Sequence, residues 1–318
     1  MTLRANNPCS NISPIANVKS LASLLGVSVD ELLQVAENVS KYWKPGAILT
    51  KKDGTQRPTS DAQRPLKHIH ARILSRILKK VHYPDYVLGG IADKWYPRDH
   101  TRHAALHAGK RVLISEDIKD FFPSATTIVV KKIWQRFFCF APQIAELLTK
   151  LTTHNNALPQ GWKTSGYLAN LVFWEKESDI VAKLKHRGLA YSRFMDDISI
   201  SSRRELSAPE KEKIVLCIYE MMFVQGFKPK RKKHRIDGAY KRMEVTGLTV
   251  NGRQPSLAKK ERDKIRAAVR CCEVQEDKQS LTYKKRWNSA SGRVARLTRY
   301  HASEGSLLRE RLKSIAPN

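Results

Sequence analysis

Three aspartates stand out because their surroundings do not suit them. Asp196 and Asp197 are adjacent within "YSRFMDDISIS", residues 191–201, where both flanks have the composition of β-strands. Asp117 follows the apolar run 112–114, just before the chain breaks into "FFP". Exposed turns often carry aspartate for backbone reasons alone, and for the 196–197 pair that interpretation stays open.

Clustered carboxylates repel one another unless a cation lies between them. Two strand ends within one sheet can bring Asp117 beside the 196–197 pair. Oxygen ligands of this kind favour Mg²⁺, with Mn²⁺ as an alternative. Two such ions can activate a hydroxyl nucleophile and stabilise a leaving pyrophosphate. The three aspartates therefore predict nucleotidyl transfer.

The charge of the chain points the same way. The 318 residues include 58 Lys+Arg against 30 Asp+Glu, a formal net charge of +28. Such an excess favours a polyanionic partner, with nucleic acid the leading candidate and an acidic membrane surface the second. We expect no membrane-spanning helix, because no run of 18 apolar residues occurs. Five cysteines without a Cys-x-x-Cys pair argue against structural zinc, and a reducing cytoplasm fits best.

Strand patterns alternate with helical ones, which predicts an α+β fold. The first two predicted helices, 17–25 and one from Ser28, resemble a helix-turn-helix, but a helical hairpin capping a larger domain is favoured. The remaining predictions follow chain order: a hairpin turning at Asp53-Gly54, a helix near 65–81, a helix broken near Pro142, a long helix from about Ser165, a helix near 208–225, a hairpin turning at Asn251-Gly252 and a basic helical end, 256–318.

Five segments now carry a resemblance. The chain contains, in order, "SEDIKDFFPS", "LPQGWKTSGYLANL", "FMDDISIS", "GFKPKRKKH" and "EVTGLTV". This order resembles the reverse transcriptase motifs, most closely those of bacterial retron reverse transcriptases, over about residues 20–300. The resemblance implies a right-hand polymerase, divided into an N-terminal helical segment 1–45, fingers 46–110, a palm 111–250 with an antiparallel sheet and a fingers insertion about 125–160, and a helical thumb 251–318.

The resemblance assigns catalytic roles. Asp117, Asp196 and Asp197 match the aspartates that hold two Mg²⁺ ions, and Phe194 stands where the family usually has tyrosine. Lys233, with Lys232 as the alternative, matches a lysine that protonates the leaving pyrophosphate.

It also implies substrate contacts. Phe122 matches the aromatic gate that excludes a 2′-OH, and its alternative is a core phenylalanine. Gln160 and Gly161 match a nucleotide-contacting segment, while Arg57 and Lys67 match residues that meet the triphosphate or are simply solvated charges. Gly166 stands where proline is common, which should loosen the start of its helix.

RNA and primer contacts are expected at three further places. Val245, Thr246 and Gly247 match the sequence near the primer grip. "HAALH" places His103 and His107 in a retron-type element, with His103 replacing asparagine. The arginines that recur every four residues on a basic helix are expected to contact phosphates, unless they form a solvated face: Arg262, Arg266 and Arg270.

The function implied is RNA-directed DNA synthesis on a bound structured non-coding RNA, primed from a guanosine 2′-OH, with dNTPs as substrates and single-stranded DNA as product. A separate effector protein and an anti-phage role follow from the same resemblance, as does the absence of a membrane partner. Two alternatives remain: another bacterial reverse transcriptase, of the group II intron-like or abortive-infection type, and a non-catalytic nucleic-acid-binding protein.

Overall fold

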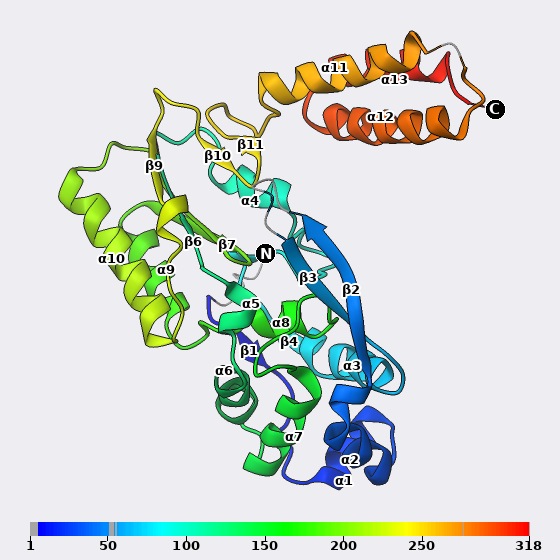
Figure 1. The fold of residues 1–318 in the computed structure, drawn as a ribbon. Coiled ribbons are helices and arrows are strands. Elements are labelled where there is room, and N and C mark those ends of the chain that lie inside the picture. The colour runs from blue at the N-terminus through cyan, green and yellow to red at the C-terminus, as the bar shows by residue number, and fades with distance from the viewer. Residues whose placement is uncertain (1–5, 51–53, 55, 276, 318) are drawn as a thin grey trace.

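The computed structural model describes residues 6–50, 54, 56–275 and 277–317 (Figure 1). At the centre of this described chain lies a five-stranded sheet in the order β5-β7-β8-β6-β9. All neighbours in it are antiparallel except β5 and β7, which are parallel. The strands are β5 (Val87–Leu88), β7 (Leu189–Phe194), β8 (Asp197–Ser202), β6 (Val112–Asp117) and β9 (Arg235–Gly238). The structure is therefore of mixed α and β composition, as predicted.

The hairpin β7–β8 turns through only two residues, Met195 and Asp196. Met195 has a left-handed backbone with φ 57°, a conformation that non-glycine residues rarely adopt. Strand composition on both sides and this tight turn put the aspartate pair at one end of the sheet, as the sequence predicts.

Helices cover the sheet and extend the main core. α9 (Glu177–His186) and α10 (Ala208–Val224) lie side by side at one side of the sheet in Figure 1. The helices between β6 and β7 are α5 (Phe121–Ser124), α6 (Thr127–Lys132), a π-helix (Ile133–Phe137), α7 (Pro142–Thr152) and α8 (Ser165–Ala169). The long helix predicted from Ser165 is wrong, because the Asn170 side chain turns back to donate to the Gly166 carbonyl and so competes with helix continuation.

The N-terminal helices join the main core. α1 (Val18–Leu25) ends at left-handed Gly26, and α2 (Val29–Glu37) begins at Ser28, whose hydroxyl accepts from the Glu31 N–H. Their buried leucines pack with α3 (Leu66–Arg76) and α7. A 3₁₀ turn (Val39–Lys41) follows α2, and another (Leu78–Lys80) follows α3. The favoured helical-hairpin interpretation agrees with this packing.

A long hairpin of β2 (Trp43–Thr50) and β3 (Gln56–Ala62) projects beside the sheet in Figure 1. Its predicted turn at Asp53 lies outside the described residues. The short strands β1 (Cys9–Ser10) and β4 (Val81–His82) pair with each other, and α4 (His100–Leu106) packs against β7.

The C-terminal part stands apart from the sheet in Figure 1. β10 (Glu244–Val245) and β11 (Leu248–Thr249) turn at Thr246-Gly247, a hairpin turn that the sequence did not predict. The chain also reverses around the predicted turn at Asn251-Gly252, where Thr249 and Ser256 pair antiparallel in an isolated bridge. α11 (Lys259–Glu273), α12 (Leu281–Tyr300) and α13 (Ala302–Lys313) form a bundle, and its core is continuous with buried residues of α4, β6, β10 and β11. In the described ranges no helix is both long and apolar enough to cross a bilayer.

Candidate active site

Asp117 and Asp197 are direct partners in the β6–β8 register. Asp196 is held beside them, because its backbone carbonyl accepts from the Ile118 N–H at 2.9 Å. The convergence predicted from two strand ends is confirmed. Asp117 is buried, so these carboxylates meet where little water can screen them.

The electrostatics of the cluster show uncompensated negative charge. Burial, and then the charges of Asp196 and Asp117, raise the pKa of Asp197 to about 7. Burial and Asp117 likewise raise the pKa of Asp196. Lys233 forms an ion pair with Asp117 that raises the pKa of the lysine despite the opposing effect of burial. The cluster therefore already attracts a cation.

A second contact anchors the segment that carries Lys233. Glu116 points to the opposite face of β6 and accepts from His234 Nδ1 at 2.6 Å and from the Tyr219 hydroxyl at 3.2 Å. Two consecutive residues of β6 thus pair with two consecutive residues at the 3₁₀ turn Arg231–Lys233. This double contact positions the Lys233 ammonium at Asp117.

A buried arginine supports the aspartate turn from below. Arg193, with no exposed side-chain surface, pairs with Glu177 at 2.6 Å and donates to the Met195 carbonyl at 3.2 Å. Asn170 accepts from the same guanidinium and donates to the Gly89 carbonyl. The left-handed Met195 conformation is held by these contacts, which in turn hold Asp196.

The carboxylates open into a cavity of about 1080 Å³. Basic and amide groups line the same cavity: Arg57 from β3, Gln160 from the loop before α8, and Lys230 and Lys233, of which Lys233 is paired with Asp117. Arg57 Nε donates to Gln160 Oε1 at 2.5 Å, so these two side chains form one continuous part of the lining. A cavity lined by carboxylates together with arginine and lysine suits a metal-bound polyphosphate.

Three other residues that were expected to contact the substrate do not line the catalytic cavity as predicted. Phe122 is half-buried and packs edge-on against Phe121, and of the two it is Phe121 that lines the cavity. Lys67 pairs with Asp61 at 2.9 Å and is not among the described residues that line the cavity. Gly161 does allow a close backbone approach, but to protein: an added Cβ would lie 2.5 Å from the Ser60 carbonyl oxygen.

His103 and His107, which were expected to contact RNA, are fully buried. The prediction that their side chains contact bound RNA is therefore wrong. His107 bridges Ser201 at 2.7 Å and Ser192 at 2.8 Å, and His103 stacks on Phe194 at 5.7 Å between ring centroids. Docking of α4 against the β7–β8 hairpin excludes both rings from solvent. Their place is structural support beneath the aspartate turn.

The residues expected near the primer grip differ in how exposed they are. Val245 is buried in the core that extends into the C-terminal bundle, so its side chain cannot contact a primer and that prediction is wrong. The Thr246 hydroxyl donates to the His100 carbonyl at 3.1 Å, while Gly247 is exposed. Only the turn itself therefore presents a surface to a primer.

The basic stripe of α11 is largely paired within the protein. Arg262 and Arg266 both form ion pairs with Glu304 of α13, and Arg270 pairs with Glu273 at 3.4 Å. Glu304, distant in sequence, and Glu273, three residues from Arg270, therefore neutralise part of this face, while its contacts to phosphates stay a prediction. Arg270, with 70% of its side chain exposed, remains the most accessible of these arginines.

Sequence reasoning missed Arg193, Glu177, Glu116 and His234. One signal was available: Arg193 lies inside the strand pattern 189–194, and an arginine buried within a sheet requires an internal partner. The partner could not be identified without the tertiary structure.

Comparison with known proteins decides the family. The family described as "Reverse transcriptase (RNA-dependent DNA polymerase)" matches residues 49–250. The retron Se72 reverse transcriptase of Salmonella heidelberg is 34% identical over 98% of this chain and 83% of its own length. The protein is a retron-type reverse transcriptase. It therefore belongs to the RNA-directed DNA polymerases. This membership rules out the alternative of a non-catalytic nucleic-acid-binding protein.

Two further matches are more distant. The retron Ec48 reverse transcriptase of Escherichia coli is 26% identical over 96% of this retron-type chain and 77% of its own. A solved structure of telomerase from Candida albicans with a TWJ fragment of telomeric RNA is 9% identical over 63% of this chain and 40% of its own, with a TM-score of 0.39, too low to define the fold. The retron relatives favour the retron type over group II intron-like and abortive-infection enzymes.

Proposed function

We propose that this reverse transcriptase copies part of a structured non-coding RNA, to which it stays bound, into single-stranded DNA. Synthesis begins at the 2′-OH of a guanosine in that RNA and uses dNTPs. The observation that carries the proposal is the Asp117–Asp197 register in a cavity that Arg57, Lys230 and Lys233 also line. The retron names of the relatives support the choice of RNA and product.

The proposed cofactor is a pair of Mg²⁺ ions, with Mn²⁺ able to replace them. The carboxylate oxygens of Asp117, Asp196 and Asp197 are ligands that hard divalent ions prefer. The ion pair between Lys233 and Asp117 shows that the same carboxylates attract a cation. Within the described residues, no three His, Cys, Asp or Glu side chains already stand in an arrangement that would hold an ion. When bound, the ions supply activation of the primer hydroxyl and charge stabilisation at the pyrophosphate.

The remaining chemistry is assigned to side chains of the cavity. Arg57 binds the triphosphate, and its hydrogen bond to Gln160 orients both groups toward the incoming nucleotide. Lys233, held at Asp117, donates its proton to the leaving pyrophosphate. Phe122 is assigned the role of excluding a ribonucleotide 2′-OH, and it packs edge-on against Phe121, which lines the cavity.

We propose that the chain is divided into the parts of a right-hand polymerase. The N-terminal helical segment comprises 1–45, the fingers 46–110, the palm 111–250 with a fingers insertion at about 125–160, and the thumb 251–318. The projecting β2–β3 hairpin, the five-stranded sheet and the separate bundle α11–α13 support it. Lys67, Gly247, Arg262, Arg266 and Arg270 remain proposed contacts to substrate or nucleic acid.

We also propose a cytoplasmic place for the enzyme, within an anti-phage retron that includes a separate effector protein. Sequencing of the nucleic acid that co-purifies with the protein tests the substrate. The expected result is a DNA strand joined to RNA through a 2′–5′ branch at a guanosine. Recovery of unbranched DNA alone would contradict the priming chemistry.

A further inference from the structure

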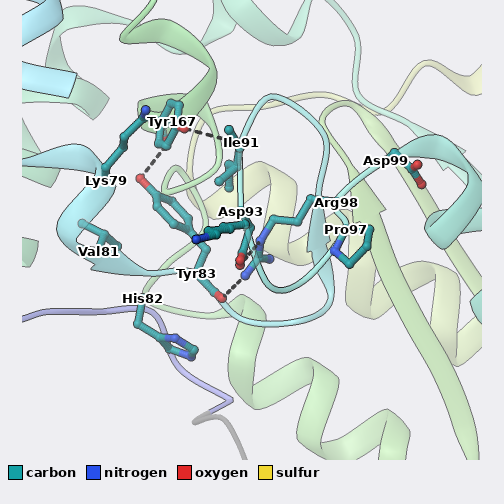
Figure 2. Close-up of a pocket in the computed structure, with 12 residues that line it drawn as sticks. Lys79, Val81, His82, Tyr83, Ile91, Asp93, Pro97, Arg98, Asp99 and Tyr167 are labelled. Atoms are coloured by element: carbon teal, nitrogen blue, oxygen red, sulfur yellow. Dashed lines mark hydrogen bonds and ion pairs between the residues drawn. The ribbon is translucent and has the colours of Figure 1, made fainter. Parts of the chain in front are cut away.

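A second cavity, of about 830 Å³, lies between the loop 91–99 and the segment 79–83 (Figure 2). None of its lining residues also lines the catalytic cavity. Lys79, Lys94 and Arg98 contribute positive charge to it, and Asp93 and Asp99 contribute negative charge. Its size is that of a small-molecule or nucleotide site.

The loop beside this cavity is rigidly supported. Arg98, only 6% exposed, donates to the carbonyls of Tyr83, Pro84 and Val87 at 2.6–2.7 Å. Figure 2 shows its guanidinium reaching the Tyr83 backbone under the loop. Asp93 accepts from the N–H groups of residues 95 and 96, both at 3.0 Å. These hydrogen bonds tie the loop to residues 83–87 and shape its own turn.

This rigid loop displays Trp95, whose side chain is 79% exposed. The Lys94 ammonium lies 4.8 Å from the centroid of its ring. The neighbouring Tyr96 ring already has the Arg102 guanidinium 4.8 Å from its centroid, and Arg102 also donates to its hydroxyl. An exposed indole among cations, on a rigid loop, is the arrangement on which an unpaired base stacks.

The charge of the rim favours a phosphate over an acidic group. Asp93 is paired with Arg98 at 3.2 Å, and Asp99 with Arg299 at 2.6 Å. Lys79 and Lys94 thus provide the excess charge of the rim. A base stacked on Trp95 has its backbone phosphate within the field of Lys94. A protein partner would instead require a contiguous apolar surface around the indole, and here its sequence neighbours are Lys94 and Tyr96.

We propose that Trp95 and Lys94, on the loop beside this cavity, form a second nucleic-acid site, which holds an unpaired nucleotide outside the catalytic cavity. The proposal rests on the proposed function, since the nucleotide comes from the bound RNA or from the single-stranded DNA product. Both sources offer the same chemistry, a π-face and a phosphate. The site retains one unpaired segment while the polymerase cavity copies another.

The test measures binding of short unstructured RNA and DNA oligonucleotides of one sequence to the full chain by fluorescence anisotropy at fixed salt. A saturating, dideoxy-terminated primer–template occupies the catalytic cavity throughout. We expect Trp95→Ala to weaken binding by about 5- to 100-fold, the value of one base–aromatic stack, and Trp95→Phe to retain most of the affinity. Lys94→Gln should lower the salt dependence of log Kd by about one unit.

Phe223→Ala, at an exposed aromatic residue on α10, is the matched control and should leave the Kd unchanged. Weakened binding of RNA, of DNA or of both supports the site. Which oligonucleotide loses affinity shows whether the bound nucleotide comes from RNA or from DNA. An unchanged Kd for both oligonucleotides in Trp95→Ala would overturn the proposal and leave the indole to a protein partner. Equal loss in Trp95→Ala and Trp95→Phe would overturn base stacking.

Two controls separate this result from the polymerase proposal. Trp95→Ala should extend a short primer–template at the wild-type rate, because the indole lies outside the catalytic cavity. The double variant Asp196→Asn/Asp197→Asn should bind the oligonucleotides as the wild type does. If the wild type extended no primer while Trp95→Ala still lost binding, the second site would stand and the proposed chemistry would fall.

Discussion

The guanidinium of Arg193 donates a hydrogen bond to the backbone carbonyl of Met195, the residue that precedes the aspartate pair. A fully buried ion pair with Glu177 fixes that guanidinium. The chain thus uses a buried charge to hold a left-handed turn of a non-glycine residue at its active site.

We predict that Arg193→Met destabilises the protein by about 3–5 kcal/mol, because Glu177 is left buried without its partner. Primer extension should fall further than the loss of folded protein explains, since the Asp196 backbone is released. Urea unfolding and rates per folded molecule measure the two effects. The matched double variant Arg193→Met/Glu177→Met should recover stability but not activity. Recovery of both would show that the pair has no positioning role.

Lys233 and Lys232 offer a comparison of adjacent lysines. Lys233→Ala should lower kcat by about 100-fold with little change in KM for dNTP, the effect of losing a general acid. Of the two, Lys233 is the lysine that pairs with Asp117, so Lys232→Ala should keep near wild-type kcat. Steady-state kinetics at saturating primer–template make the measurement. Equal effects of both substitutions would contradict the assignment of the proton to Lys233.

A substitution at Gly161 tests whether the contact between Gln160 and Arg57 matters for substrate binding. Its φ is 106°, and an added Cβ would lie 2.5 Å from the Ser60 oxygen, so Gly161→Ala should push Gln160 away from Arg57. We expect the KM for dNTP to rise about tenfold, roughly the value of one lost hydrogen bond to a charged group. Gly188→Ala is the matched control: Gly188 has φ 75° but open space around it, so it carries backbone strain without a collision. A similar KM for both variants would rule out the role of the Gly161 contact.

The buried histidines predict how stability depends on pH. Burial lowers the pKa of His70 and of His103 from 6.5 to about 4. The unfolded chain therefore takes up these protons first as pH falls. The free energy of unfolding should be flat with respect to these groups above about pH 6.5 and should fall between about pH 6.5 and 4, by on the order of 3 kcal/mol for each histidine.

Urea unfolding across this pH range measures the slope. His70→Gln keeps a side-chain donor for the Leu151 carbonyl, to which His70 Nε2 now donates, but does not titrate. Its slope below pH 6.5 should be shallower than that of the wild type. An identical slope would mean that His70 is not held neutral in the folded protein.

The parts of this molecule that the sequence predicts are those with local causes. Strand composition around residues 189–202 and a two-residue turn are enough to place Asp196 and Asp197 at a sheet end, and the same reasoning places Asp117. Gly26 and Ser28 likewise end and begin helices through their own backbone and side-chain chemistry.

Features that depend on distant segments could not be predicted. Arg262 pairs with Glu304, 42 positions away, and this ion pair has no local sequence signal. His103 and His107 lose their exposure because α4 docks under the β7–β8 hairpin. Asn251 binds the backbone at Met243 and Lys241, on the other side of the β10–β11 hairpin, and no local pattern encodes those contacts.

The central claim is that the carboxylates at Asp117, Asp196 and Asp197 carry out metal-dependent nucleotidyl transfer at a cost to folding stability. Asp197→Asn removes one charge from a cluster that burial and repulsion already strain. Primer extension on an RNA template with Mg²⁺, measured beside thermal unfolding, tests the claim most directly. The account predicts that Asp197→Asn extends more than about 100-fold more slowly while its Tm is equal to or above that of the wild type. Extension at the wild-type rate by a folded Asp197→Asn protein would contradict it.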